Sequence, residues 1–158
     1  MKNSRRRARE FALQALYQWL VNECSADVLL AQFKEQKDFA KADQALVESL
    51  LRGVTGNAEG LRSCITPYLD RPVKELSPVE HALLLLAACE LRDHPGTPYK
   101  VVINEAIELA KSFGGTDGHK YVNGVLDKLA AELRLAEVKR NLTQRREDAK
   151  ETQQKSRT

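Results

Sequence analysis

Apolar and polar residues follow a helical period along most of this chain. In each periodic segment the apolar residues recur at intervals of three and four positions, which places them on one face of an α-helix. Runs rich in Val, Ile and Thr that alternate with a period of two, as in β-strands, are missing. The pattern therefore predicts an all-α protein of about seven helices. The first four cover about residues 4–21, 26–34, 43–54 and 58–66, and three more begin near residues 78, 98 and 117.

The fifth predicted helix has the clearest start signal and the most apolar sequence. Ser77 can cap its N-terminus, Pro78 suits the first helical position, and Glu80 can complete a capping box. Eight consecutive apolar residues follow, from Ala82 to Cys89. Because a helix that is apolar on every side is buried, we expect this helix to lie at the centre of the fold.

The glycine-rich segment before the last predicted helix allows two interpretations. Gly114-Gly115 can end the preceding helix, since glycine tolerates the left-handed conformation. A phosphate-binding loop of the Gly-Lys-Ser/Thr type is not matched, because His119 interrupts the motif and a helix precedes it. The segment is therefore either a plain connection or a helix N-terminus at which Lys120 and Tyr121 bind a phosphate and a stacked base of RNA.

The net charge of +3 is distributed unevenly along the chain. Residues 1–10 hold five basic residues and one glutamate, and residues 138–158 hold seven basic and three acidic residues, so the segment between them is net negative. A polyanion would therefore be bound at the ends or at local patches. A basic N-terminus is also commonly no more than a solvated run of charge. The net negative charge of the segment between the two ends is complementary to a basic protein partner.

The C-terminal segment differs in composition from the rest of the chain. Beyond Glu137 it consists mostly of Lys, Arg, Gln, Glu and Thr, and Leu142 is the only large apolar residue after Val138. Such a segment cannot bury enough apolar surface to offset its ordering entropy. We therefore predict a helical domain over residues 1–137 and a basic tail over residues 138–158 that is disordered or a frayed extension of the last helix.

Several classes of protein are not expected. Apolar runs stay well short of the ~20 residues that a membrane span needs, and a charged amphipathic stretch follows the basic start where a secretory signal would be apolar. Cys24, Cys64 and Cys89 are odd in number and form no CxxC pair, which argues against a disulfide framework or a zinc site. They suit small core residues in a reducing cytoplasm.

Catalytic or metal-binding constellations are not apparent either. The three histidines are scattered, and no Ser-His-Asp or Cys-His arrangement can be proposed from the spacing. Glu105 and Glu108 are one helical turn apart, but no histidine falls at a metal-ligand spacing from them, so a solvated face is expected. We therefore predict a protein that is not an enzyme and needs no cofactor or metal.

Two aromatic residues of the first predicted helix are expected to differ in role. Trp19 falls with the apolar face and is expected in the core. Tyr17 projects from another side and could mark an interface, where tyrosine is enriched.

Several blocks of the sequence resemble the NusB family. The strongest runs from Pro98 through Asp127 and includes the His119-Lys120-Tyr121 segment. The resemblance covers about residues 4–136 and leaves the tail uncovered. The other matching blocks are Arg5 to Glu10, Ala15-Leu16-Tyr17 and Pro67-Tyr68-Leu69.

The resemblance implies a fold of two small helical bundles that form one compact unit. It also implies a bacterial transcription antitermination factor, which binds the boxA element of ribosomal RNA leader transcripts as a heterodimer with NusE, a small-subunit ribosomal protein. NusA, NusG and RNA polymerase join the larger complex, and some family members pair as homodimers.

Family positions also imply roles for individual residues. They direct Tyr17 and Glu80 toward NusE, although Glu80 could serve only as a helix cap. Tyr121 stands where the family often has Phe, which preserves a stacking ring, whereas the long basic tail is not a usual family feature. The residues implied to bind RNA are Lys2, Arg5, Arg6, Arg7, Arg9, Lys120 and Tyr121.

Two other classes of function remain open from the sequence. A related helical domain occurs in ribosomal RNA cytosine methyltransferases, so the chain could be the RNA-binding part of an enzyme. The absence of a glycine-rich cofactor segment argues against catalysis in this chain. A purely protein-binding helical scaffold is the other alternative.

Overall fold

The computed structural model describes residues 2–113 and 118–156, with the side chains of residues 4–113 and 118–153. The described residues form eight α-helices and three short 3₁₀ segments, with no strand among them. The all-α prediction is confirmed, and the helix beyond the expected seven comes from the C-terminal segment. The elements are α1 (Lys2–Asn22), α2 (Ala26–Lys34), η1 (Lys37–Lys41), α3 (Gln44–Gly56), α4 (Ala58–Ile65), η2 (Thr66–Tyr68), η3 (Val73–Glu75), α5 (Pro78–Asp93), α6 (Tyr99–Phe113), α7 (Gly118–Leu133) and α8 (Leu135–Ser156).

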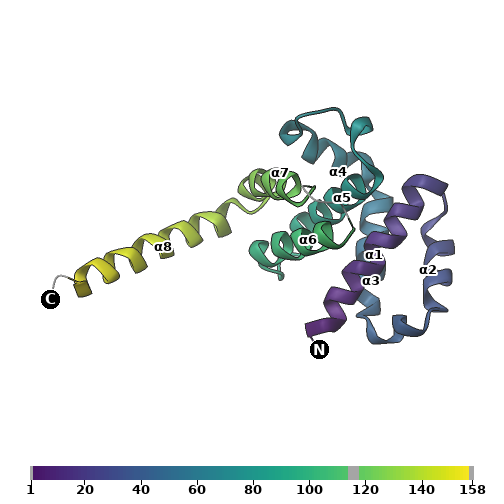
Figure 1. Ribbon diagram of the computed structural model, residues 1–158, viewed down its shortest axis with the longest axis horizontal. Helices are drawn as coiled ribbons and strands as arrows, with labels where there is room; N and C mark the ends of the chain where they lie inside the picture. The colour runs from purple at the N-terminus through teal and green to yellow at the C-terminus, as the bar shows by residue number, and fades with distance from the viewer. Residues whose placement is uncertain (1, 114–117, 157–158) are drawn as a thin grey trace.

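Helix α5 lies at the centre of the fold, as its apolar sequence predicts. Every residue from Ala82 to Leu91 is buried. Helices α1, α3, α4, α6 and α7 all pack on α5, with α1 and α3 on one side of it and α6 and α7 on another (Figure 1). The two helical groups therefore share α5 and form one continuous core.

The predicted start signal of α5 has a slightly different geometry from a capping box. The Ser77 hydroxyl accepts a hydrogen bond from the Glu80 backbone N–H at 3.1 Å and donates one to the Glu80 carboxylate at 2.8 Å. The Glu80 carboxylate therefore accepts its hydrogen bond from the Ser77 hydroxyl. In a capping box it would accept from the Ser77 backbone N–H instead. A cap of this kind stabilises a helix by ~1 kcal/mol.

The C-terminal segment is helical where it is described. Helix α8 follows a break at Arg134 and leaves the body of the molecule (Figure 1). Arg134 is buried and donates to the backbone carbonyls of Leu91, His94 and Thr97 at 2.7, 2.8 and 3.0 Å. The sequence left open a disordered tail or a helical extension, and the structure describes a helix. The boundary between residues 137 and 138 stays a prediction.

The three cysteines are free and differ in burial: Cys89 is buried, as expected of a core residue, whereas Cys24 and Cys64 are only partly buried. Burial raises the pKa of the Cys89 thiol to about 12. Thiols of that kind are inert core groups. None of the helices in the described part of the chain combines the length and apolar character needed to cross a membrane.

Candidate nucleic-acid and partner interfaces

Arg9 differs from the other N-terminal arginines because it points into the core. It is 5% exposed, and its guanidinium donates to both carboxylate oxygens of Glu90, with the shortest contact at 2.6 Å. Burial by itself lowers the pKa of Arg9, but the hydrogen bonds and charge of Glu90 raise it more, so the guanidinium stays charged. The prediction that Arg9 contacts RNA is therefore corrected: it holds α1 on α5. Its position relative to Leu13 and Leu16, four and seven residues on, was the sequence signal for an inward orientation.

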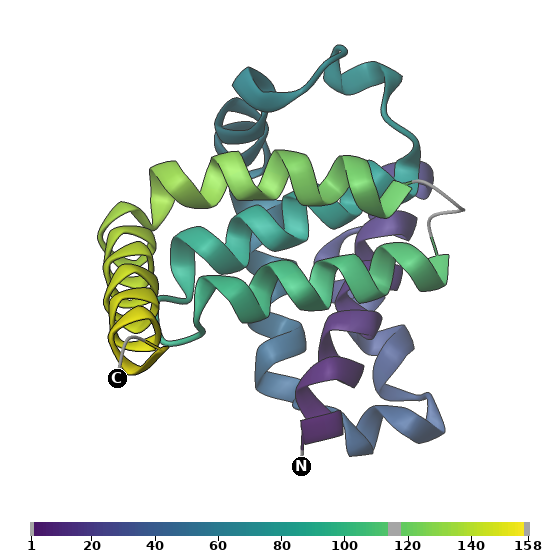
Figure 2. The ribbon, with the colours of Figure 1, turned by 60° about the vertical axis from the view of Figure 1, so that its left-hand side comes forward.

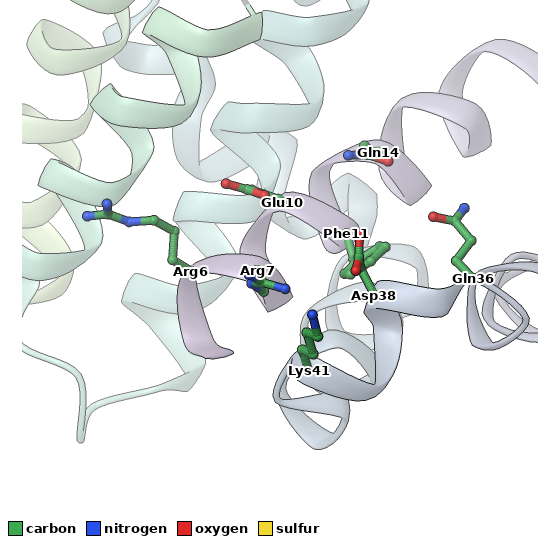
Figure 3. A pocket seen from close by; sticks show the side chains of 8 residues that line it. All are labelled: Arg6, Arg7, Glu10, Phe11, Gln14, Gln36, Asp38 and Lys41. Carbon is green, nitrogen blue, oxygen red and sulfur yellow. The ribbon is translucent and has the colours of Figure 1, made fainter. Parts of the chain in front are cut away.

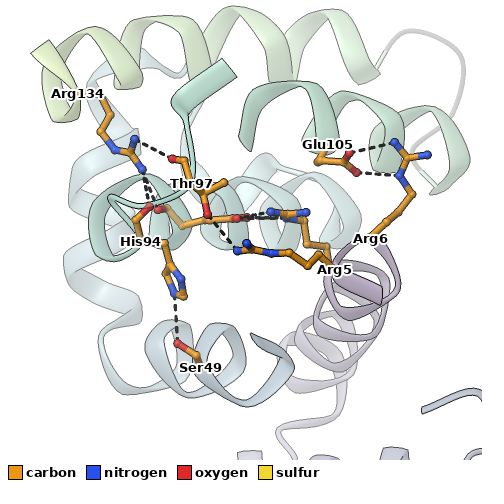
Figure 4. A network of polar contacts seen from close by, with 9 residues as sticks. Arg5, Arg6, Ser49, His94, Thr97, Glu105 and Arg134 are labelled. Carbon is orange, nitrogen blue, oxygen red and sulfur yellow. Dashed lines mark hydrogen bonds and ion pairs between the residues drawn. The ribbon is translucent and has the colours of Figure 1, made fainter. Parts of the chain in front are cut away.

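Arg5 and Arg6 are exposed, yet both are engaged with the C-terminal half of the chain (Figure 4). Arg5 donates to the Thr97 hydroxyl at 3.1 Å. Arg6 makes a bidentate contact with Glu105, with both distances at 3.0 Å, and these hydrogen bonds raise the pKa of Arg6. Glu105, expected on a solvated face, is thus the acceptor that ties α1 to α6. RNA contact by Arg5 and Arg6 stays a prediction.

Arg7 lies at an open hollow between α1 and η1 (Figure 3). The hollow has a volume of about 510 Å³ and combines Arg6, Arg7 and Lys41 with Glu10 and Asp38. Lys41 is a cation that the sequence did not single out, because only the fold brings η1 next to the start of α1. The side chain of Lys2 lies outside the described residues.

Tyr121 lies in the first turn of α7, partly buried against the core. Its hydroxyl accepts a hydrogen bond from the Asp70 backbone N–H at 3.3 Å, and the Arg71 guanidinium lies 4.7 Å from the ring centroid. Asp70 holds that guanidinium with contacts of 2.7 and 3.2 Å. Burial raises the pKa of the Tyr121 hydroxyl. One face of the ring is therefore covered by Arg71, a residue that sequence analysis missed; Lys120, beside it, is exposed.

The structure does not bring all the predicted RNA contacts together. Figure 2 shows the start of α1 and the start of α7 well apart, with α6 between them in that view. An RNA that touched both would have to pass across α6. The glycine-rich stretch 114–117 lies outside the described residues.

Tyr17 and the start of α5 meet at an apolar hollow. The hollow has a volume of about 310 Å³, and its apolar lining comes from Leu13 and Tyr17 of α1, Val79 of α5 and Phe113 of α6. Tyr17 is 41% exposed and Phe113 is 44% exposed. Glu80 follows Val79 and is half-buried. Phe113 is the last residue of α6 and is not among the buried residues of that helix.

Trp19, by contrast, is partly buried and packs against the core, as expected. It therefore contributes to the packing of α1 and not to this exposed hollow.

Comparisons with known proteins decide the family. The family model described as the NusB family matches residues 6–131. The chain belongs to the NusB family. Among the relatives of this NusB-family chain, the "Transcription antitermination protein NusB" of Paraburkholderia phytofirmans is 55% identical over 137 residues, which are 87% of this chain and 95% of the relative. The protein of the same name from Chromobacterium violaceum is 53% identical over 149 residues, 94% of this chain and 100% of the relative.

Solved structures give the same fold. T. maritima NusB has a TM-score of 0.70 and 30% sequence identity, covering 80% of this chain and 90% of that chain. A chain in the crystal structure of a plectonemic RNA supercoil also reaches 0.70, covering 80% of this chain and 94% of that one, but at 22% identity it shows the fold alone.

Family membership confirms two expectations from the sequence. The resemblance to the NusB family was correct, and the relatives are named for a regulatory role in transcription and not for catalysis, so this chain is not an enzyme. Because the NusB-family chain covers 95% or more of the two relatives described above, these are small proteins of similar length and not larger enzymes that contain such a domain.

Proposed function

We propose that this chain is a transcription antitermination factor that binds boxA RNA of ribosomal RNA leader transcripts as a heterodimer with NusE. The observation that carries the proposal is its 55% identity to proteins named for transcription antitermination. NusA, NusG and RNA polymerase would complete the assembly in the cytoplasm, where transcripts are made.

The RNA part of the proposal rests on two cationic regions. One is the start of α1, where Lys2, Arg5, Arg6 and Arg7 would meet phosphates in the way that Lys and Arg generally do. The other is the start of α7, where Lys120 would meet a phosphate at a helix N-terminus. A base would stack there on the aromatic layer formed by Tyr121 and the guanidinium above it.

The protein part of the proposal rests on the apolar hollow around Tyr17. Exposed aromatic side chains at such a hollow are typical anchors for a protein partner. Glu80, which follows the lining residue Val79, would supply a negative charge toward a basic ribosomal protein. A second copy of the chain could occupy the same face in a homodimer.

A titration of boxA RNA, with and without NusE, tests the proposal. Fluorescence anisotropy would compare a boxA RNA with an RNA of the same length and composition in which boxA is scrambled. We expect tighter binding to boxA, and a further gain when NusE is present. Equal binding to both RNAs, unchanged by NusE, would contradict the proposed function.

A further inference from the structure

Helix α8 is a prominent feature to which the proposed function gives no role. Its first turns are anchored to α6: Glu137 accepts from the Tyr99 backbone N–H at 2.9 Å, and Asn141 donates to the Tyr99 hydroxyl at 2.9 Å. From Leu142 to Gln153 every side chain is exposed. Figure 1 shows the helix projecting well beyond the body of the molecule. A helix in this position is held at a fixed angle at its base and presents its outer turns entirely to solvent.

The charged residues of α8 are sorted onto different sides of the helix. At 3.6 residues per turn, Lys139, Arg146 and Lys150 fall on one strip, because they are seven and four positions apart. This basic strip lies opposite Glu137 and Asn141, the residues that face the body. Of the acidic residues in the outer turns, Asp148 and Glu151 fall on the side away from the basic strip, whereas Glu147 lies at its edge, three positions before Lys150.

The basic strip is left without ion pairs in the described part of the chain. Lys139, Arg146 and Lys150 form no ion pair with any residue that the structure describes. Two of the α1 arginines differ in this respect, since Arg6 and Arg9 each hold a carboxylate. A cation that is already paired with a carboxylate must break that ion pair before it binds a phosphate. The cations of the basic strip have no such ion pair to break.

We propose that the basic strip of α8 is a second contact for RNA, which binds the phosphates that flank boxA without reading their sequence. The proposal rests on the proposed function, because it extends the same RNA site. The ends of the strip, Lys139 and Lys150, are eleven positions apart, which corresponds to ~16 Å along the helix. Three cations in a row over that length match the charge of a backbone that carries one negative charge per nucleotide.

The composition of α8 favours RNA over other occupants. Its large exposed apolar residues, Leu135 and Leu142, lie in the first turns, and the basic strip continues beyond them. A helix that lies on a membrane needs large apolar residues along its apolar face, and a protein interface needs a desolvated anchor at its centre. Two copies packed through the basic strip would bring like charges together. A polyanion is the occupant that the strip fits.

A pair of charge-matched double variants of the full chain tests the proposal. Arg146→Gln/Lys150→Gln removes two cations from the basic strip. Arg140→Gln/Arg145→Gln removes two from other sides of α8 and is the control, and Gln preserves helix propensity in both. The probes are a minimal boxA RNA, the same RNA with single-stranded flanks, and an RNA of equal length that lacks boxA, each titrated over a range of salt concentrations.

We expect the basic-strip variant to bind the flanked RNA on the order of tenfold more weakly, with a salt slope smaller by ~1.4 for two lost single-strand contacts. The control should stay near wild type, and all three proteins should bind minimal boxA equally. Equal losses in the two variants, or no loss in either, would overturn the proposal.

The two proposals fail in different ways. If the wild-type chain does not prefer boxA, the proposed function fails. The contact by α8 would still be supported if only the basic-strip variant bound both long RNAs more weakly than wild type. If boxA is preferred but the basic-strip variant behaves as wild type, only the inference about α8 fails. If the basic-strip variant bound RNA as wild type does but no longer bound vesicles of anionic phospholipid that wild type binds, the basic strip would be assigned to a membrane surface. That result would overturn the inference.

Discussion

At the scale of single residues, the arginines of α1 show how one sequence signal separates into different roles. Each position on an α-helix is rotated by 100° from the last, so neighbouring arginines cannot all face the same surroundings. Arg9 faces the core and Glu90, Arg6 faces Glu105, and Arg7 faces an open hollow. In the sequence these residues form one basic patch. In the fold they differ in function, because each faces different neighbours.

The Arg9–Glu90 pair gives a prediction about stability. Arg9→Ala would leave the buried Glu90 carboxylate without a partner, and breaking a buried pair in this way costs ~3–5 kcal/mol of unfolding free energy. The double variant Arg9→Met/Glu90→Leu should recover most of that loss, because it removes both charges. Urea denaturation of both variants measures the effect.

A matched control is Arg6→Ala, which breaks an exposed pair and should change the unfolding free energy far less. If Arg9→Ala were as stable as Arg6→Ala, the structural role of Arg9 would be refuted.

Tyr121 gives a prediction about RNA binding. Tyr121→Phe keeps the ring and should bind boxA RNA almost normally, whereas Tyr121→Ala should lose ~1–3 kcal/mol, the range for one stacking aromatic. The affinity for NusE should change less, because Tyr121 does not line the hollow around Tyr17. Separate titrations with RNA and NusE, together with thermal melting, test this. A large drop in melting temperature with parallel loss of both partners would show that Tyr121 acts mainly in packing.

At the scale of elements, the contact between α4 and α5 includes a histidine whose neutral form is favoured. The Arg62 guanidinium donates to Nε2 of His81 at 3.1 Å, and Arg62 also pairs with Glu59. Burial first, and the charge of Arg62 second, lower the pKa of His81 below its ordinary value of 6.5. The folded protein therefore favours the uncharged imidazole, and protonation of His81 works against this helix contact.

This contact predicts a dependence of stability on pH. Because the pKa of His81 is lower in the folded state than in the unfolded state, its contribution is complete above about pH 6.5 and is lost as the pH falls through the folded pKa. The variant His81→Gln, whose side-chain oxygen can still accept from Arg62, should show a weaker decline over that range. Denaturation curves at a series of pH values would compare the two proteins. Identical pH profiles would exclude His81 as the titrating group.

At the scale of the whole molecule, the partner surface combines residues from three helices around one hollow. Glu80→Lys should lower the affinity for NusE by roughly 2 kcal/mol or more if the charge meets a buried cation. Part of that effect would come from the helix cap, which contributes ~1 kcal/mol. Calorimetric titration with NusE measures the loss.

Ser77→Ala is the control for this change, because it removes the cap and keeps the charge of Glu80. Wild-type affinity for NusE in Glu80→Lys would remove Glu80 from the interface.

The sequence by itself determined the helical fold class, the central position of α5 and the family. These properties depend on local patterns: the spacing of apolar residues, the cap before Pro78, and the contiguous blocks from Pro98 to Asp127. Helical periodicity and capping depend on residues only a few positions apart, so both can be recognised from the sequence alone.

Only the tertiary structure decided which polar residues remain available for partners. Glu90 lies 81 positions from Arg9 and Glu105 lies 99 positions from Arg6, so neither pairing leaves a local trace. The cover of Arg71 over Tyr121 depends in the same way on a loop from another part of the chain. Burial and charge pairing are set by which helices meet across the core. This is why the basic start of the chain is partly structural, while the basic strip of α8 has no ion pair with the residues that the structure describes.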